Sequence, residues 1–185
     1  MLDKNKLIKE LQALPCGTGD GFKAKEFADK VKSVVPRSYI LTDHAVDGVT
    51  LLREMFGVIS YISSLGSSRN SISCFYNRDN NNFRLNEKLT SDRKKMFLAI
   101  CAAKLLLWKA SNQEFKNFVF YENRPLYEDA EDKKAFDLAV ELLTDSYCFK
   151  NEALKYKLDE KRICKALLLP LPVVLNKLIS DDLMR

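Results

Sequence analysis

The sequence Met96-Phe97-Leu98-Ala99-Ile100-Cys101-Ala102-Ala103-Lys104-Leu105-Leu106-Leu107-Trp108 decides the fold, because every residue in it except Lys104 is apolar. The run is rich in Leu and Ala and contains no Gly or Pro, which predicts a helix. Thr90 or Ser91 can cap this helix, and Asp92 suits its first turn. A helix that is apolar on nearly every side belongs in a protein core, and this one is too short for a membrane span, which needs roughly 20 residues.

Length and composition suit a single domain, since the chain has 185 residues, of which 46% are hydrophobic. Its net charge of +5 is arranged in blocks. Basic residues predominate over 84–116 and 150–185, and acidic residues predominate over 121–145. Such alternation is typical of solvated helix faces, whereas a nucleic-acid surface gathers its cations on one side. We therefore favour helix faces over a nucleic-acid stripe.

Cysteine and histidine usage limits the chemistry. The cysteines are odd in number and form no CxxC pair, which predicts free thiols in a reducing compartment: Cys16, Cys74, Cys101, Cys148 and Cys164. The N-terminus shows no apolar signal segment, so we expect a cytoplasmic protein without membrane attachment. His44 is the single histidine, which excludes any metal site that needs two or three imidazoles. We expect it to be a surface or capping residue.

The remaining sequence predicts an α+β protein. Apolar spacing predicts helices over 3–14, 22–34, 43–56, 128–143, 159–169 and 172–179. Alternating or β-branched runs predict strands over 58–62, 71–76 and 82–86, which we expect to form a small three-stranded antiparallel sheet packed on the central helix. The aromatic segment 115–121 fits either a buried loop or a short strand. The glycine-rich segment 16–21 lacks the Gly-Lys-Ser/Thr end of a phosphate-binding loop and is interpreted as a turn.

The order of these elements resembles the ImmA/IrrE metallopeptidase-like family over residues 43–145, and more loosely to 179. Residues 49–58 look like the opening helix of the family and its connection to the sheet. Residues 83–96 are similar to its strand, asparagine, loop and "sxeRqrF" segment, and residues 135–143 resemble its "AnxFAaeLL" helix. The resemblance implies a zincin-like domain over 41–150, with a helical N-terminal extension over 1–40 and a helix-turn-helix-like tail over 151–185 packed on the same domain.

Active members of this family carry "AHELxH" on the central helix, where two histidines hold zinc and the glutamate activates the metal-bound water. A later "ExxA" helix supplies the third protein ligand. Laid onto this chain, the resemblance puts Ile100 at the first histidine, Cys101 at the glutamate, Lys104 at the second histidine and Asp132 at the third ligand. These residues do not suit zinc, so we expect a degenerate site with no catalytic residues, no metal and no cofactor.

A lysine within an apolar helix needs a partner, because an unpaired buried charge is costly. Asp132, Glu131 and Glu128 at the acidic start of the later helix are candidate counterions, and we predict a Lys104–Asp132 ion pair at the former metal position. The alternative is that Lys104 reaches solvent along its stem. We expect Cys101 to be a packing thiol. A nucleophilic Cys101 activated by Lys104 is the competing possibility.

The sequence favours a protein that acts by binding another protein. The C-terminal helix begins Pro172-Val173-Val174-Leu175, which suits packing better than DNA reading, since a recognition helix begins with polar or basic residues. The resemblance implies a pseudoenzyme of a phage or mobile element that acts as a regulator, an antirepressor or an inhibitor. The resemblance implies a repressor, a toxin–antitoxin protein or a host regulatory factor as partner. The alternative is a DNA-binding transcriptional regulator that uses the tail. Residues 1–40 are either a partner surface or a packing cap.

Overall fold

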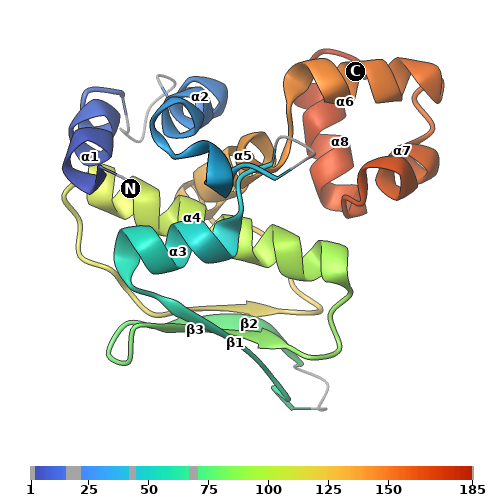
Figure 1. Cartoon of the computed structure of the whole chain (residues 1–185). Helices are drawn as coiled ribbons and strands as arrows, with labels where there is room; N and C mark the ends of the chain where they lie inside the picture. Colours follow the sequence, from blue (N-terminus) through green and yellow to red (C-terminus); the bar gives the residue numbers. More distant parts are fainter. Residues whose placement is uncertain (1–2, 16–21, 42–44, 67–70, 185) are drawn as a thin grey trace.

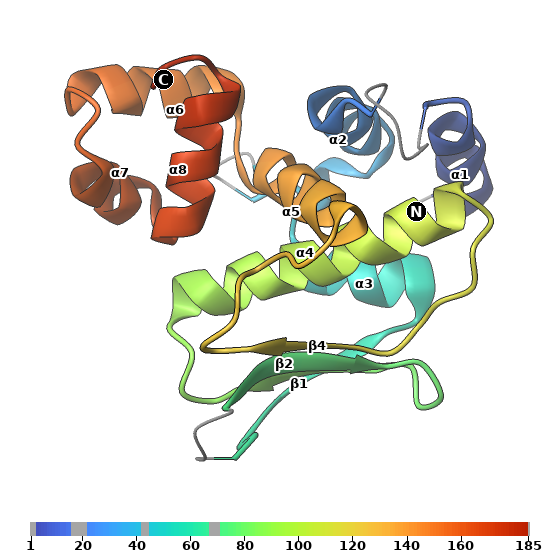
Figure 2. The same ribbon diagram turned by 180° about the vertical axis from the view of Figure 1, so that it is seen from behind.

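Figure 1 shows the computed structural model, which describes residues 3–15, 22–41, 45–66 and 71–184. A mixed sheet lies beneath the long helix α4 (Ser91–Ala110), and most of the other helices gather on the opposite side of α4. Figure 2 shows from behind that no helix covers the outer face of the sheet. The α+β class predicted from the sequence is confirmed.

Helix α4 forms the centre of the core, as its apolar composition predicts. From Met96 to Trp108 every side chain except that of Leu98 is buried. Its N-cap is Thr90, whose side chain makes no capping hydrogen bond. Helix α3 (Gly48–Phe56) crosses α4 at Gly48, where an added Cβ would lie 3.1 Å from the Leu98 carbonyl carbon and Cβ. A glycine is therefore required for the close approach of the two backbones.

The sheet has four strands and is mixed, so the expected three-stranded antiparallel sheet is wrong in two respects. Strands β1 (Ile59–Ser63), β2 (Ile72–Asn77), β3 (Asn82–Asn86) and β4 (Phe118–Tyr121) lie in the order β1-β3-β2-β4. The hairpin of β2 and β3 is antiparallel as expected, but β1 pairs in parallel with β3. The aromatic segment that fitted either a loop or a strand supplies β4, antiparallel to β2.

Three further helices cover the face of α4 that lies away from the sheet: α1 (Lys4–Gln12), α2 (Ala24–Val34) and α5 (Ala130–Leu143). Leu7 and Leu11 of α1, with Phe27 and Val31 of α2, lie in the same buried cluster as α4. The helix expected from residue 43 begins later, as α3, with Asp47 at its N-cap. His44, Thr42 and Asp43 lie outside the described residues, as does the glycine-rich segment 16–21.

The C-terminal part contains α6 (Ser146–Lys155), α7 (Glu160–Leu167) and α8 (Leu171–Ser180). Helix α6 was not expected from the sequence. Its N-cap Asp145 accepts a hydrogen bond from the backbone N–H of Cys148 at 2.9 Å. Helices α7 and α8 meet at an angle of 110°, and the turn between them includes Leu168 at φ +51°.

The cysteines and the lengths of the helices can be compared with what the composition predicts. The four cysteines within the described ranges are all free, as predicted: Cys74, Cys101, Cys148 and Cys164. Among the helices that the structure describes, none is by itself long and apolar enough to cross a membrane, and only the bent α7–α8 pair reaches that length and composition when taken together.

Candidate functional site

The predicted Lys104–Asp132 ion pair is present in the structure. The Nζ of Lys104, in the middle of α4, donates a hydrogen bond to Oδ1 of Asp132, in the first turn of α5. The side chain of Lys104 is 7% exposed and that of Asp132 is 21% exposed. The charge pair therefore lies at the inner end of a depression and not on the open surface. The alternative in which Lys104 extends into solvent is wrong.

Aromatic rings surround the ammonium group of Lys104. Its Nζ lies 5.6 Å from the ring centre of Trp108, 5.1 Å from that of Phe118 and 5.9 Å from that of Phe120. The negative faces of aromatic rings attract a cation at such distances, and the attraction is stronger where water is excluded. One carboxylate and several rings thus compensate the desolvation of Lys104.

The start of α5 positions Asp132. The side chain of Asp129 caps the helix and accepts a hydrogen bond from the Asp132 backbone N–H at 2.7 Å. Carboxylates are stabilised at this end of a helix by its dipole. The neighbouring Glu131 accepts a hydrogen bond from the indole Nε1 of Trp108 at 2.5 Å. Helices α4 and α5 are therefore joined by two polar contacts, one turn apart on α4.

A recess of about 90 Å³ opens beside the ion pair, between strand β4 and the segment that leads into α5. Arg124 lies near its mouth and pairs with Glu128 at 3.5 Å. Both of these side chains are more than half exposed, so their pairing contributes little to stability. The principal lining residues are Lys104, Phe118, Phe120, Arg124, Glu128 and Asp132.

The other two positions that the resemblance singled out do not join this pair. Ile100 and Cys101 are buried in α4. Burial raises the pKa of the Cys101 thiol well above its ordinary value, although the Lys104 charge acts in the opposite direction. Burial chiefly raises the pKa values of Cys74 and Tyr76 of β2, and the nearby Cys101 raises them further, so the Cys101 thiol lies on the sheet side of α4. A protonated, enclosed thiol is unsuited to nucleophilic attack.

The side chains at these four positions do not fit a catalytic zinc ion. Ile100 offers no ligand atom, Cys101 faces the sheet, and the Lys104 ammonium occupies Asp132 and would repel a cation. Within the described residues, no group of three or more His, Cys, Asp and Glu side chains is arranged to hold a metal ion. What the site can do chemically is lock α4 to α5 and present a small recess of mixed charge.

A second buried charge cluster, which the sequence reasoning missed, anchors α8. The Nζ of Lys177, a side chain with no exposed surface, lies 2.8 Å from both carboxylate oxygens of Glu141 on α5. It also lies 2.9 Å from Oγ of Ser146 and 2.9 Å from Oδ1 of Asp181. The sequence feature that could have revealed this cluster is the same as for Lys104, namely one lysine within an apolar helical run.

Lys32 on α2 completes this region by capping the end of α5. Its Nζ donates to the carbonyl oxygens of Glu141 at 2.8 Å and Thr144 at 2.6 Å. These carbonyls belong to the unpaired C-terminal end of a helix, where a cation is favourable. Burial lowers the pKa of Lys32, with nearby carboxylates, chiefly that of Glu141, opposing the effect. The half-buried Lys32 thus joins α2 to α5, and the buried Lys177 joins α8 to α5.

The exposed side of α8 is apolar. Leu171 and Ile179 are 46% and 64% exposed, and the half-buried Leu175 lies between them at helical spacing. The lysine of this helix, Lys177, is turned inward to the buried cluster. A DNA-reading helix presents polar and basic side chains to the groove. The exposed side of α8 therefore lacks the basic side chains of a DNA-reading helix.

Comparisons with known proteins add one likeness of fold. No family model matches the chain, and no curated protein matches it. Among solved structures, the chain is similar to a Mycobacterium tuberculosis transcriptional regulator, with a TM-score of 0.50 and 13% sequence identity. The likeness covers 94% of this chain and 46% of that protein, so the chain spans less than half of its length. At 13% identity, this likeness concerns the fold alone.

Proposed function

We propose that this chain is a non-catalytic, zincin-like relative of the ImmA/IrrE metallopeptidases that acts by binding another protein. The observation that carries the proposal is the enclosed Lys104–Asp132 ion pair. It fills the space between the central helix and the acidic helix with a cation and its counterion, and it leaves no oxygen or nitrogen ligand set. In this proposal the buried ion pair stabilises the fold, and surface residues bind the partner.

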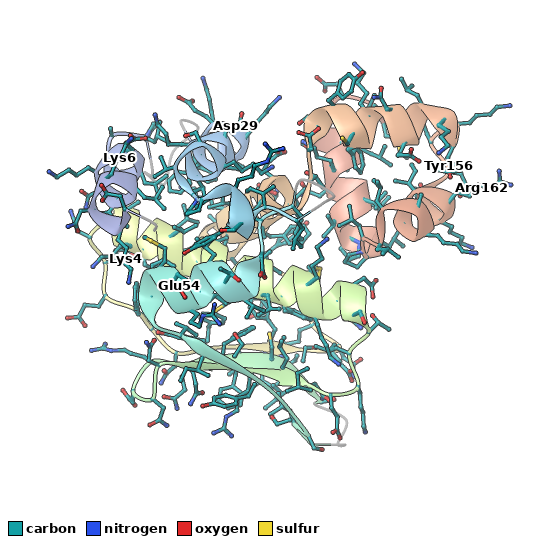
Figure 3. All side chains as sticks on the ribbon, viewed as in Figure 1. Lys4, Lys6, Asp29, Glu54, Tyr156 and Arg162 are labelled. Atoms are coloured by element: carbon teal, nitrogen blue, oxygen red, sulfur yellow. The ribbon has the colours of Figure 1, made fainter. Side chains whose placement is uncertain are left out.

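The partner in this proposal is a regulatory protein of the cytoplasm, such as a repressor, a toxin–antitoxin protein or a host regulatory factor. The chain then acts as an antirepressor or inhibitor within a phage or mobile element. Helix α1 offers a surface for such a partner. It buries Leu7 and Leu11 against the core and exposes Lys4, Lys6 and Lys9, the first two of which are labelled in Figure 3. Exposed cations on this helix favour an acidic partner face and accelerate association with it.

Two variants and one mass measurement test this function. The tagged protein is used to capture its partner from the native host, and the intact mass of the partner is followed during incubation. We expect a stoichiometric complex in which the partner keeps its full mass. Reversing Lys4, Lys6 and Lys9 to Glu should weaken the complex strongly. The same reversal at the exposed Lys155, Lys157 and Lys161 should not. Cleavage of the partner would overturn the proposal.

The alternative function is a DNA-binding transcriptional regulator that uses α7 and α8. Two observations favour it: the name of the Mycobacterium tuberculosis neighbour, and the 110° angle between α7 and α8, which suits a helix-turn-helix. The inward-turned Lys177 and the apolar face of α8 oppose it. DNA binding by the purified protein that weakens steeply as salt is raised would support this alternative, since each phosphate contact releases counterions.

A further inference from the structure

Strand β1 forms one edge of the sheet, and its outward side is unpaired within the described residues. The sheet order places β3 on one side of β1 and no described strand on the other. Natural proteins protect such edges with lysine, proline or a bulge, because unpaired N–H and C=O groups invite another strand. The sequence Ile59-Ser60-Tyr61-Ile62-Ser63 contains none of these protective residues.

The hydrogen bonds to β3 show which backbone groups of β1 remain free. The N–H of Ile59 donates to the carbonyl of Asn81, and the carbonyl of Ser63 accepts from the N–H of Glu87. In a parallel ladder, alternate residues direct both of their backbone groups to the same neighbour. Ile59, Tyr61 and Ser63 therefore bond to β3. The N–H and C=O groups of Ser60 and Ile62 point outward at the free edge.

The side chains of β1 are apolar and exposed. Ile59, Tyr61 and Ile62 are 55%, 47% and 63% exposed. Tyr61 lies level with the exposed Arg84 of β3, on the sheet face that no helix covers in Figure 2. Exposed apolar side chains beside a free strand edge are typical of a surface that is covered by another chain.

The geometry points to a second copy of this chain as the occupant, with the two β1 strands paired antiparallel about a two-fold axis at Tyr61. In this register Ser60 of each copy lies opposite Ile62 of the other. These are the residues with free backbone groups, so each of the two Ser60–Ile62 pairs forms two hydrogen bonds. A register centred on Ser60 pairs fewer of these groups, because it sets Ile62 opposite Val58, whose N–H already donates to Leu52.

The side chains match in the same register. Each Ile59 lies opposite Ser63 of the second copy, and each Ile62 lies opposite Ser60, so a large residue faces a small one on both sides of the sheet. The two Tyr61 rings meet at the axis, where cross-strand aromatic pairs are stabilising. The strand carries no charge that would repel its copy. The dimer joins two four-stranded sheets into one continuous sheet, and it is independent of the proposed function.

Site-directed crosslinking tests this dimer and its register. Tyr61→Cys places two thiols opposite each other across the axis in a non-hydrogen-bonded pair, with about 4.5 Å between Cα atoms, within reach of a disulfide. Ile59→Cys is the matched control, since it is equally exposed on the same sheet face but its two copies lie about 14 Å apart along the strands. We expect mild oxidation to crosslink the Tyr61→Cys variant and not the Ile59→Cys variant or the unsubstituted chain. Equal crosslinking of the two variants, or none, would overturn the proposal.

Sedimentation over about two decades of concentration supplies the second test. We expect a reversible dimer with a dissociation constant of about 10 µM, in keeping with a small interface. Ser60→Pro removes an outward N–H without touching the ladder to β3, and should weaken the dimer at least tenfold. Tyr147→Lys on α6, also at an exposed tyrosine, should leave it unchanged. A chain that remains monomeric throughout, or a dimer insensitive to Ser60→Pro, would contradict the proposal.

Discussion

Removing Asp132 should destabilise the protein far more than removing Lys104. In Asp132→Ala the Lys104 side chain, which is 7% exposed in the original protein, keeps its aromatic surroundings and loses its carboxylate partner. Breaking a buried ion pair from one side costs about 3–5 kcal/mol. Because the Asp132 side chain is 21% exposed and the rings still attract the cation, we expect about 2–4 kcal/mol here.

Removing Lys104 instead of Asp132 should lower the free energy of unfolding less. In Lys104→Met an apolar chain of similar length enters an apolar, aromatic space, and Asp132 keeps the helix dipole and partial access to water. We expect this variant to stay within about 1 kcal/mol of the original stability. When Lys104 is already Met, Asp132→Ala should also lower the free energy of unfolding only slightly, because no cation is left unpaired. The two substitutions should therefore be coupled by about 2 kcal/mol.

Urea unfolding measures these free energies, followed by far-ultraviolet circular dichroism and by the fluorescence of Trp108, the single tryptophan, which borders the pair. In thermal unfolding, Asp132→Ala should lower the midpoint by about 5–12 °C for a chain of this size. Glu128→Ala is the control, because its exposed pairing with Arg124 is worth less than about 1 kcal/mol. Equal costs for Asp132→Ala and Glu128→Ala would refute the reasoning.

Three further predictions concern other buried groups. Lys177→Met should cost about 3–5 kcal/mol in urea unfolding, since it leaves Glu141 and Asp181 unpaired, whereas the exposed Lys155→Met should change stability by less than about 1 kcal/mol; equal effects would contradict the buried cluster. Burial, with Cys101 as a smaller cause, raises the pKa of Tyr76 to about 12, above the 10.0 of a free tyrosine. The folded state thus holds this proton longer than the unfolded state, so its contribution is complete below pH 10.0 and is lost as pH rises towards about 12. Phenolate absorbance should show one late-titrating tyrosine that Tyr76→Phe removes; a late step that survives in the variant would refute the assignment. Iodoacetamide should modify Cys148 and Cys164 of the native protein before Cys101, because Cys101 is fully buried and its pKa is raised; selective early alkylation of Cys101 would revive a nucleophilic role.

The central helix and its ion pair could be predicted because both follow from local rules. A long apolar run without glycine or proline leaves few alternatives to a buried helix. A lone lysine within this run requires a counterion. The acidic start of α5 offered few candidates, of which Asp132 is the partner in the structure. The same rule applied to Lys177 would have found its pairing with Glu141, which also interrupts an apolar stripe.

The arrangement of the sheet could not be predicted, because pairing is decided by tertiary contacts. The β-branched and aromatic residues of 58–62 indicate a strand but not its neighbour. Strand β1 lies in parallel beside β3, and the chain from β1 to β2 must pass β3 to reach its place. Helix α6 was missed because its apolar residues do not follow helical spacing, and only Phe149 and Ala153 are buried. Its start depends on the cap at Asp145, a signal that is clear only in retrospect.

Metal analysis of the purified protein tests the central claim most directly. The proposed function requires Lys104 and Asp132 to satisfy each other in place of a catalytic zinc ion. It predicts that protein dialysed against zinc and then freed of excess metal retains far less than one zinc ion per chain, with the fluorescence of Trp108 unchanged. One tightly bound zinc ion per chain, lost in the Asp132→Ala variant, would contradict it.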